Sequence, residues 1–334
     1  MKRAASLVLM IAMQTLFIAQ GGYANATPAQ SKVDLIFAGD TTLDSTPGEF
    51  IRRGADPFAE FAPLFAKADI RVVNLECVVA TKGRPLDKHY TFRAHPRVLP
   101  VLQRHVDAVT VANNHSGDFG REAFAEMLDL LKRHRIAPIG GGMNLQQAHS
   151  PLILERNGLR IALLSYNEFM PRSYEADVNA PGVAWSEDLR VKDDIRQARL
   201  RHRADVVITL MHWGWENEWV ANGRQRQLAR LAIDAGADAV LGGHPHVTQD
   251  IDIYKGKPIV YSVGNFVMKE TDNPRQRQGW VVRLKMDAQG VFAFDTHKVN
   301  IDRRGLPSLN REGDSPCWQK SWTSTQPCSS SFPD

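Results

Sequence analysis

Apolar runs alternate with amphipathic segments along the first three quarters of the chain. Runs with the composition of buried strands end in polar residues at 33–40, 70–76, 107–115, 159–167, 204–214 and 238–246. Apolar residues recur at helical spacing at 57–69, 121–135 and 224–237. Strand patterns dominate later, at 257–266, 279–287 and 291–301. This order predicts an α/β fold in which a second, more antiparallel sheet packs on the first.

The first 26 residues have the pattern of a secretory signal peptide. A basic start is followed by a short apolar run and by Ala24-Asn25-Ala26, which fits a cleavage site. An uncleaved membrane anchor is the alternative, but the run is short and is interrupted by Gln14. We therefore expect a mature chain that begins at Thr27 and is periplasmic or secreted.

The pattern also suggests how the rest of the chain is organised. Residues 27–302 are expected to form one domain, and residues 303–334, which lose the apolar periodicity, a loosely ordered tail. In an oxidising compartment Cys317 and Cys328 could form a disulfide within that tail. Cys77 follows an apolar run and is expected to be a buried free thiol.

Charge narrows the range of partners. The 334 residues carry 41 basic and 37 acidic side chains, and removal of Lys2 and Arg3 with the signal segment lowers the net charge from +4 to +2. A nearly balanced chain gives no electrostatic case for binding nucleic acid.

The polar ends of the strands contain most of the candidate chemistry. Histidine, asparagine and carboxylate side chains follow five of the runs, at Asp40, at Asn74 and Glu76, at Asn114 and His115, at His212, and at His244 and His246. Open α/β sheets bind their ligands at the carboxyl ends of the strands. This set of side chains suits one or two divalent ions, Mn, Zn, Fe or Mg, and paired ions are a common device for phosphoester cleavage.

The order of these motifs resembles that of a known family. "GD", "NLE", "ANNH..D.G", "HWG", "GGHPHV" and "YSVGNF" follow one another as in the CapA family of poly-γ-glutamate or capsule biosynthesis proteins, related to the calcineurin-like metallophosphoesterases. The resemblance covers about residues 33–300. It implies a two-sheet sandwich flanked by helices, with α/β/β/α layers and a metal site at the strand ends.

The resemblance also implies roles for individual residues. The metal ligands would be Asp40, Glu76, Asn114, His212, His244 and His246, and the general acid would be His115. Asp118 would orient His115, although it could instead cap the helix that begins near Arg121. Asn74, Trp213, Glu216 and Asn265 are candidates for substrate binding; packing of Trp213 in the core and a role of Asn265 in a turn are the alternatives.

Two positions depart from the pattern of the superfamily. Its first motif is Asp-x-His, but this chain has Thr42 where the histidine stands, and Glu76 replaces the usual bridging aspartate. The ion held by Asp40 and His246 is therefore expected to be the weaker one.

Two functions remain open from the sequence. One is an exported metal-dependent hydrolase of capsule or poly-γ-glutamate-type polymer metabolism, cleaving a phosphoester or an amide of an anionic polymer. The other is a non-catalytic component that holds the polymer for a membrane-bound synthesis or export complex. The retained Asn114-His115 pair favours the enzyme, and the missing histidine at position 42 favours the binding component.

Overall fold

Alternate residues of the first strand face two different apolar layers. In β1 (Val33–Thr41), Leu35 and Phe37 belong to one buried cluster, and Ile36 and Ala38 belong to another. Side chains point alternately to the two faces of a strand, so this strand is buried on both sides. The computed structural model describes residues 31–269 and 271–328, and the predicted signal segment at 1–26 lies outside them.

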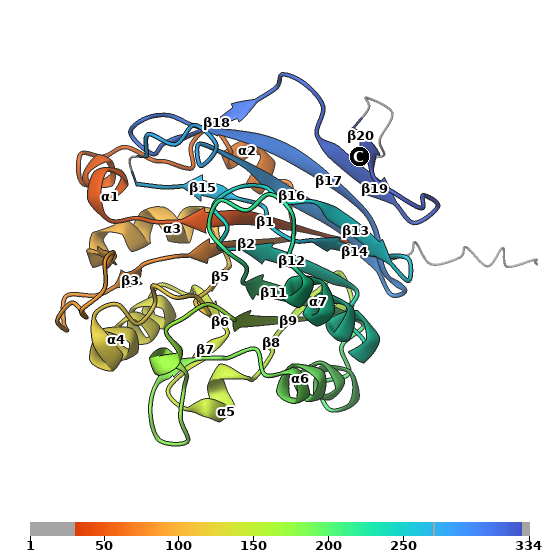
Figure 1. Ribbon diagram of the computed structural model, residues 1–334, viewed down its shortest axis with the longest axis horizontal. Helices are drawn as coiled ribbons and strands as arrows, with labels where there is room; N and C mark the ends of the chain where they lie inside the picture. Colours follow the sequence, from red (N-terminus) through yellow and green to blue (C-terminus); the bar gives the residue numbers. More distant parts are fainter. Residues whose placement is uncertain (1–30, 270, 329–334) are drawn as a thin grey trace, which may run out of the picture. The chain divides into compact units, whose positions relative to one another are not determined.

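The first sheet combines parallel and antiparallel strands (Figure 1). Its parallel part comprises β1, β2 (Ile70–Leu75), β5 (Ala108–Thr110) and β6 (Ala137–Ile139), and β15 (Asn265–Val267) also pairs parallel with β1. On the other side of β1 the antiparallel strands are β16 (Gln278–Asp287), β17 (Gly290–Ile301), β18 (Pro307–Asn310), β19 (Pro316–Gln319) and β20 (Gln326–Pro327). The expectation that the late strands form a second, more antiparallel sheet is therefore wrong, since they extend the first sheet.

The second sheet has a parallel centre and antiparallel edges. Its order is β13 (Ile251–Tyr254), β14 (Lys257–Val260), β12 (Ala239–Gly243), β11 (Val206–His212), β9 (Leu159–Asn167) and β8 (Leu152–Arg156). Two-residue strands form two further pairs, β3 (Val78–Val79) with β4 (Arg93–Ala94) and β7 (Gly141–Gly142) with β10 (Gly182–Val183). The predicted run at 257–266 is divided between the two sheets, because the chain turns after Val260 and re-enters at Asn265.

Helices cover the outer faces of both sheets (Figure 1). On the first sheet lie α1 (Ser45–Arg52), α2 (Ala62–Phe65), α3 (Leu99–His105) and α4 (Gly120–Arg133). On the second lie α5 (Leu145–Ala148), α6 (Asp188–Leu200) and α7 (Gly223–Ala235). Single 3-10 turns occur at Pro96–Val98 and Arg172–Tyr174. The apolar cluster that includes Leu35 and Phe37 fills the space between the sheets, so the predicted α/β/β/α sandwich is confirmed.

The segment at 57–69 is only partly helical. The structure has turns there and the four-residue helix α2. Phe58, Phe61 and Phe65 are buried in the cluster above the first sheet and contact the ring of Phe266. The apolar spacing reflects this aromatic packing, and Pro63 lies in the first turn of α2, where a proline is tolerated but would not fit the interior of a longer helix.

Residues 303–328 differ from the loosely ordered tail that the sequence predicts. β18 and β19 both pair with β17, and Trp318 is buried between the sheets. Backbone pairing and one large aromatic side chain fix a segment whose apolar periodicity is too short to recognise. Cys317 and Cys328 form a disulfide and Cys77 is a buried free thiol, so both cysteine predictions are confirmed.

Loss of this disulfide is expected to destabilise the protein. The bond joins cysteines 11 positions apart, and a closed loop of about this length is worth about 3 kcal/mol through the entropy of the unfolded chain. Replacing both cysteines by alanine should therefore lower the urea midpoint, and adding a reductant to the wild type should do the same. Equal midpoints for oxidised and reduced protein would contradict the expectation.

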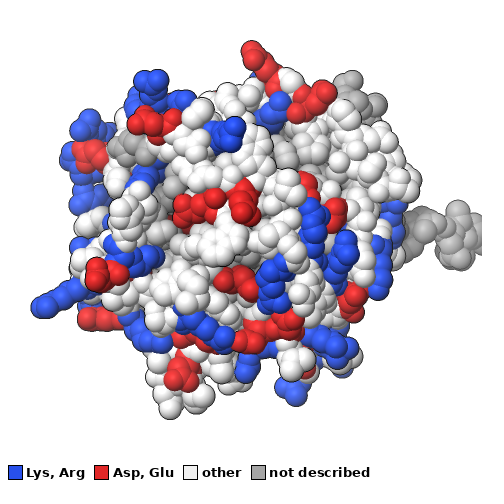
Figure 2. Space-filling view, viewed as in Figure 1, with Lys and Arg blue, Asp and Glu red and all other residues white. Residues whose placement is uncertain are grey.

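Acidic and basic side chains are interspersed on the face drawn in Figure 2, in keeping with the balanced composition. No helix in the described part of the chain combines the length and apolar character that a bilayer span requires.

Candidate metal centre

Strand register brings the predicted ligands of the first sheet together. Asp40 at the end of β1 lies opposite Asn74 at the end of β2, and the pairing shifts between Ala38 and Asp40. The intervening Gly39 packs directly against the carbonyl oxygen of Gly264, where a Cβ atom would collide. Only glycine fits at position 39, and the irregular backbone there directs the carboxylate of Asp40 to the edge of the sheet.

The second sheet contributes its ligands from the facing edge. His212 ends β11 and lies opposite Gly243, the last residue of β12. A Cβ atom on Gly243 would lie 2.8 Å from Oδ1 of Asp40, so glycine here lets the two sheets approach. The backbone N–H of His244 donates to Oδ2 of Asp40 over 3.2 Å, which joins the sheets at the site.

Glu76 lies between the histidines. Its Oε1 is 3.4 Å from Nε2 of His212 and 3.9 Å from Nε2 of His246, and the glutamate is fully buried. Asn114 places its Oδ1 2.8 Å from the same Nε2 of His212. The structure thus gathers these predicted ligands into one buried cluster with the glutamate at its centre.

The His244-Pro245-His246 turn has an unusual backbone. His244 has a φ of 95° and His246 a φ of 58°, values that residues other than glycine rarely adopt. The N–H of Asn217 donates to the carbonyl of Pro245 over 2.9 Å and holds the turn from outside. Strained backbone of this kind concentrates at functional sites, where it aims side chains. Here both imidazoles are turned into the cluster from one short loop.

The charges of the cluster are strongly coupled. Burial raises the pKa of Asp40, but hydrogen bonding and attraction to His246 outweigh burial and lower it. Burial opposes protonation of His246, yet Glu76 and Asp40 raise its pKa to about 10. Burial, together with His212 and His246, holds the pKa of His244 well below its usual range. Two carboxylates therefore face three imidazoles, and His244 is neutral, as a metal ligand must be.

Several donor atoms of the cluster have no hydrogen-bond partner among the described residues. Among the described residues, both carboxylate oxygens of Glu76 and both ring nitrogens of His244 are buried without a hydrogen bond. One donor atom from each of Glu76, His244 and His246 falls within 4.8 Å of the others. Buried polar atoms are rarely left unsatisfied in native proteins. A divalent ion bound by nitrogen and oxygen ligands would satisfy these atoms, so the residues fit the implied metal.

His115 is held at the edge of the cluster. Its Nδ1 is 2.7 Å from Oδ2 of Asp118, and its ring packs on Phe92 with centroids 4.2 Å apart. Asp118 is fully buried and also accepts from Nζ of Lys88 over 2.6 Å. Asp118 therefore orients His115, and it makes no cap for α4, whose N-cap residue is Phe119. Lys88 could not be identified from the sequence, because a single lysine in a loop has no spacing to recognise.

Three of the four residues predicted to bind substrate have other contacts. Asn74 donates to Oδ1 of Asp40 over 2.7 Å and accepts from Thr110, so it supports the ligands. Asn265 places its Oδ1 2.9 Å from Nδ1 of His246 and orients that ring. Trp213 is buried and donates to the carbonyl of Tyr261, so it packs in the core. All three side chains are buried, and contact of any of them with a substrate stays a prediction.

The fourth residue and its loop lie at the surface. Glu216 is exposed on the loop after β11, and the adjacent Trp215 packs edge-on against Phe169 with centroids 5.6 Å apart. Phe169 in turn covers His244, with centroids 3.8 Å apart. The contact of Phe169 with the metal centre could not be predicted from the sequence, because Phe169 follows β9 outside any recognisable motif.

Thr42 is buried beside the cluster but offers it no imidazole. Its hydroxyl points to the sulfur of Met268, 3.7 Å away, and its N–H bonds to Val267. The expectation that an ion at Asp40 and His246 is the weaker one remains a prediction.

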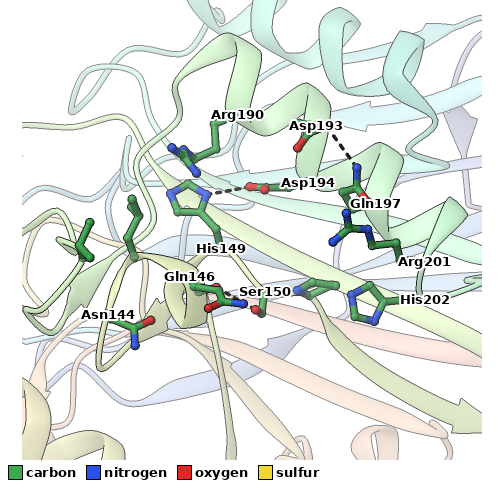
Figure 3. A pocket seen from close by; sticks show the side chains of 13 residues that line it. Asn144, Gln146, His149, Ser150, Arg190, Asp193, Asp194, Gln197, Arg201 and His202 are labelled. Carbon is green, nitrogen blue, oxygen red and sulfur yellow. Dashed lines mark hydrogen bonds and ion pairs between the residues drawn. The ribbon is translucent and has the colours of Figure 1, made fainter.

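A separate pocket lies between α5 and α6 and contains none of the predicted site residues (Figure 3). His149 on its wall points to Asp194, with Nδ1 2.7 Å from Oδ2, and His202 also lines the pocket. The sequence assigned neither histidine to a site, and neither lies among the metal-centre residues.

Comparisons with known proteins agree with the motifs. The profile of the family described as "Bacterial capsule synthesis protein PGA_cap" matches residues 34–270. The PGA biosynthesis protein CapA of Bacillus subtilis (strain 168) is 31% identical over 75% of this chain and 66% of its own length. The capsule biosynthesis protein CapA of Bacillus anthracis is 28% identical over 83% of this chain and 69% of its own. The chain thus spans about two thirds of the length of these relatives.

A solved structure shows the same fold. The 5'-nucleotidase precursor from Thermus thermophilus matches with a TM-score of 0.50 and 15% identity, over 83% of this chain and 56% of that one. At this identity the likeness establishes a shared sandwich fold and nothing about the reaction.

Proposed function

Because the chain belongs to the bacterial capsule synthesis family PGA_cap, we propose that it is a metal-dependent hydrolase that acts on a capsule polymer. The observation that supports this most is the buried, unpartnered donor set of Glu76 and His244 beside His115. A purely structural cluster would satisfy those atoms internally, whereas a metal-binding cluster leaves them for the ion.

Glu76, Asn114, His212 and His244 would hold one ion, and Asp40 and His246 would hold a second, weaker one. A divalent ion supplies Lewis acidity, which polarises an oxygen of the substrate and makes water a stronger nucleophile. Asn74 and Asn265 support this set, since they hold Asp40 and His246 in place. Hydrogen-bond partners that fix the orientation of a ligating side chain raise the affinity of the site for the metal.

His115 would move the proton. Because Nδ1 is committed to Asp118, Nε2 is left to donate to the leaving group of the substrate. Lys88 donates to the other oxygen of Asp118 and so fixes the carboxylate that orients the ring. The buried Asp118 thereby holds the imidazole in one tautomer without contacting the substrate.

The proposal is tested by hydrolysis assays on the purified protein. Phosphomonoesters, phosphodiesters and capsule polymers would be offered with and without a chelator. Metal-dependent cleavage of one class supports the enzyme. A protein that retains metal and cleaves none of them would favour the second function, a non-catalytic component that holds the polymer for a membrane-bound synthesis complex; the absence of a histidine at position 42 supports that alternative.

Export is part of the proposal, since a capsule is assembled outside the cytoplasm. We expect the signal segment to be removed after Ala26, so that the mature chain begins at Thr27. Intact-mass measurement of protein recovered from the periplasm or the medium would show this. A mass that includes residues 1–26 would instead indicate a retained anchor.

A further inference from the structure

The most exposed apolar side chains of the protein lie on or beside α6. Leu189 is 82% exposed and Leu200 76%, and both belong to this helix. Val178, which is 67% exposed, lines the pocket between α5 and α6. No other large apolar side chain among the described residues is exposed to this extent. A single exposed leucine is ordinary, but apolar side chains that gather on one face mark an interaction site.

The spacing along α6 places the two leucines on its outer face. Leu189 and Leu200 are separated by about three turns of the helix, and Arg196 lies on the same side between them. Val191 and Ile195 lie on the opposite side and are buried in the apolar cluster under the helix. The leucines therefore take no part in packing α6 on the second sheet.

Basic side chains without an acidic partner surround the leucines. Arg190 and Arg201 line the pocket on one side of α6 (Figure 3), and Lys192 and Arg196 line a groove between α6 and α7 on the other. None of these four side chains forms a hydrogen bond or an ion pair with another described residue. Arg230, across the groove on α7, lies over an aromatic ring and pairs with no carboxylate in the described part of the chain.

The acidic side chains around this face have partners, with one exception. The pairs, with N···O distances of 2.6, 2.7 and 2.6 Å, are Asp188 with Arg224, Asp194 with His149, and Asp234 with Lys255. Asp193 has no basic partner among the described residues and accepts only from a glutamine side chain. The free charge on this face is therefore strongly positive, and an anionic surface would relieve the repulsion between the cations.

Cations around exposed leucines suit an anionic lipid surface. Lysine and arginine are attracted to acidic head groups, while leucine side chains enter the apolar region just below them. An anionic polymer in water would attract the cations but would leave the leucines exposed to water. We propose that the outer face of α6, from Leu189 to Leu200, lies on the surface of an anionic phospholipid bilayer.

A short series of contacts links this face to the metal centre. Arg224 pairs with Asp188 at the start of α6 and with Glu168, over 2.6 and 2.7 Å. The next residue, Phe169, packs against His244 with centroids 3.8 Å apart. A protein bound through α6 would therefore hold its metal centre near the bilayer. Binding to lipid requires neither a metal nor a substrate, so this inference does not depend on the proposed hydrolysis.

Vesicle binding tests the inference on the mature protein, which begins at Thr27 and lacks the apolar N-terminal segment. Sedimentation would measure its partition onto vesicles of phosphatidylglycerol mixed with phosphatidylcholine, and onto vesicles of phosphatidylcholine alone. We expect binding to the mixed vesicles that falls as salt screens the charges, and little binding to the neutral ones. Binding to neither kind of vesicle, or equal binding to both, would overturn the inference.

Two double substitutions separate the apolar and the charged contributions. Leu189→Gln together with Leu200→Gln should reduce the partition at least about tenfold, because the amides do not enter the apolar region. Lys192→Gln together with Arg196→Gln should reduce it about thirtyfold at low salt, since each basic side chain near an anionic surface contributes about fivefold. None of the four side chains is buried, so the melting temperature should stay close to that of the wild type.

Matched controls remove the same chemistry from other faces. Lys67→Gln together with Arg97→Gln removes two exposed charges beside α2 and α3, and Val220→Gln removes an exposed apolar side chain from the loop after β11. These variants should bind vesicles as the wild type does. If the α6 variants bound as well as the controls, this face would not be the lipid surface. If the wild type bound soluble poly-γ-glutamate but no vesicle, the cations would belong to a polymer site and the inference would be wrong.

Discussion

Replacing His115 by alanine is expected to slow hydrolysis by about 10²–10⁴-fold, the usual contribution of a general acid. The side chain contacts Asp118 and Phe92 but lies at the edge of the cluster of unpartnered donor atoms. The metal content should therefore stay close to that of the wild type. Steady-state rates at saturating metal would measure the loss.

His105→Ala is the matched control for that substitution. His105 is also buried and paired with an aspartate, since its Nε2 lies 2.8 Å from Oδ2 of Asp56, but it belongs to α3 and lies outside the cluster. This variant should retain the wild-type rate per folded molecule. If His115→Ala were as active as His105→Ala, the proton-transfer role of His115 would be wrong.

His244→Ala should remove the tightly bound ion and lower the melting temperature. The imidazole is fully buried, its pKa is held well below the usual range by burial, and neither ring nitrogen has a partner among the described residues. An ion bound only by the native state adds its binding free energy to stability, about 2.7 kcal/mol when free metal is a hundred times its dissociation constant. Thermal unfolding and metal analysis of the same sample would measure both effects.

His149→Ala separates loss of metal from loss of packing. His149 is buried and hydrogen-bonded to Asp194 in the pocket between α5 and α6. Its removal should also lower the melting temperature, but the variant should retain the metal. A chelator should lower the melting temperature of the wild type and of His149→Ala while hardly changing that of His244→Ala. Equal sensitivity of all three proteins to the chelator would contradict the assignment of His244.

The spacing and order of apolar residues predicted an α/β fold with two packed sheets and the location of the cluster, and the family resemblance implied the α/β/β/α layers. Asp40 and Glu76 follow neighbouring strands of the first sheet, and His212 and His244 follow neighbouring strands of the second. Parallel neighbours end on the same side, so each pair lies at one edge of its own sheet. Helices such as α4 and α7 have strong amphipathic patterns and end within two residues of their predicted limits. These features depend on local spacing, which a sequence shows directly.

Features that depend on tertiary contacts could not be predicted in this way. Trp213 resembles its exposed neighbours in sequence, but its indole N–H bonds to the carbonyl of Tyr261 in the core. Lys88 reaches Asp118 from a loop 30 positions away. Strands β18 and β19 form because β17 offers them a free edge, and their own pattern is too short to reveal them. In each case the partner lies far away in the sequence.

The central claim is that Glu76 and His244 leave their donor atoms free for a divalent ion. Elemental analysis of the purified wild-type protein, after dialysis against metal-free buffer and again after reconstitution with Zn, Mn or Fe, tests this most directly. We expect at least one tightly retained ion per chain, which Glu76→Gln and His244→Ala each remove. A wild-type protein that retains no ion under either condition would contradict it.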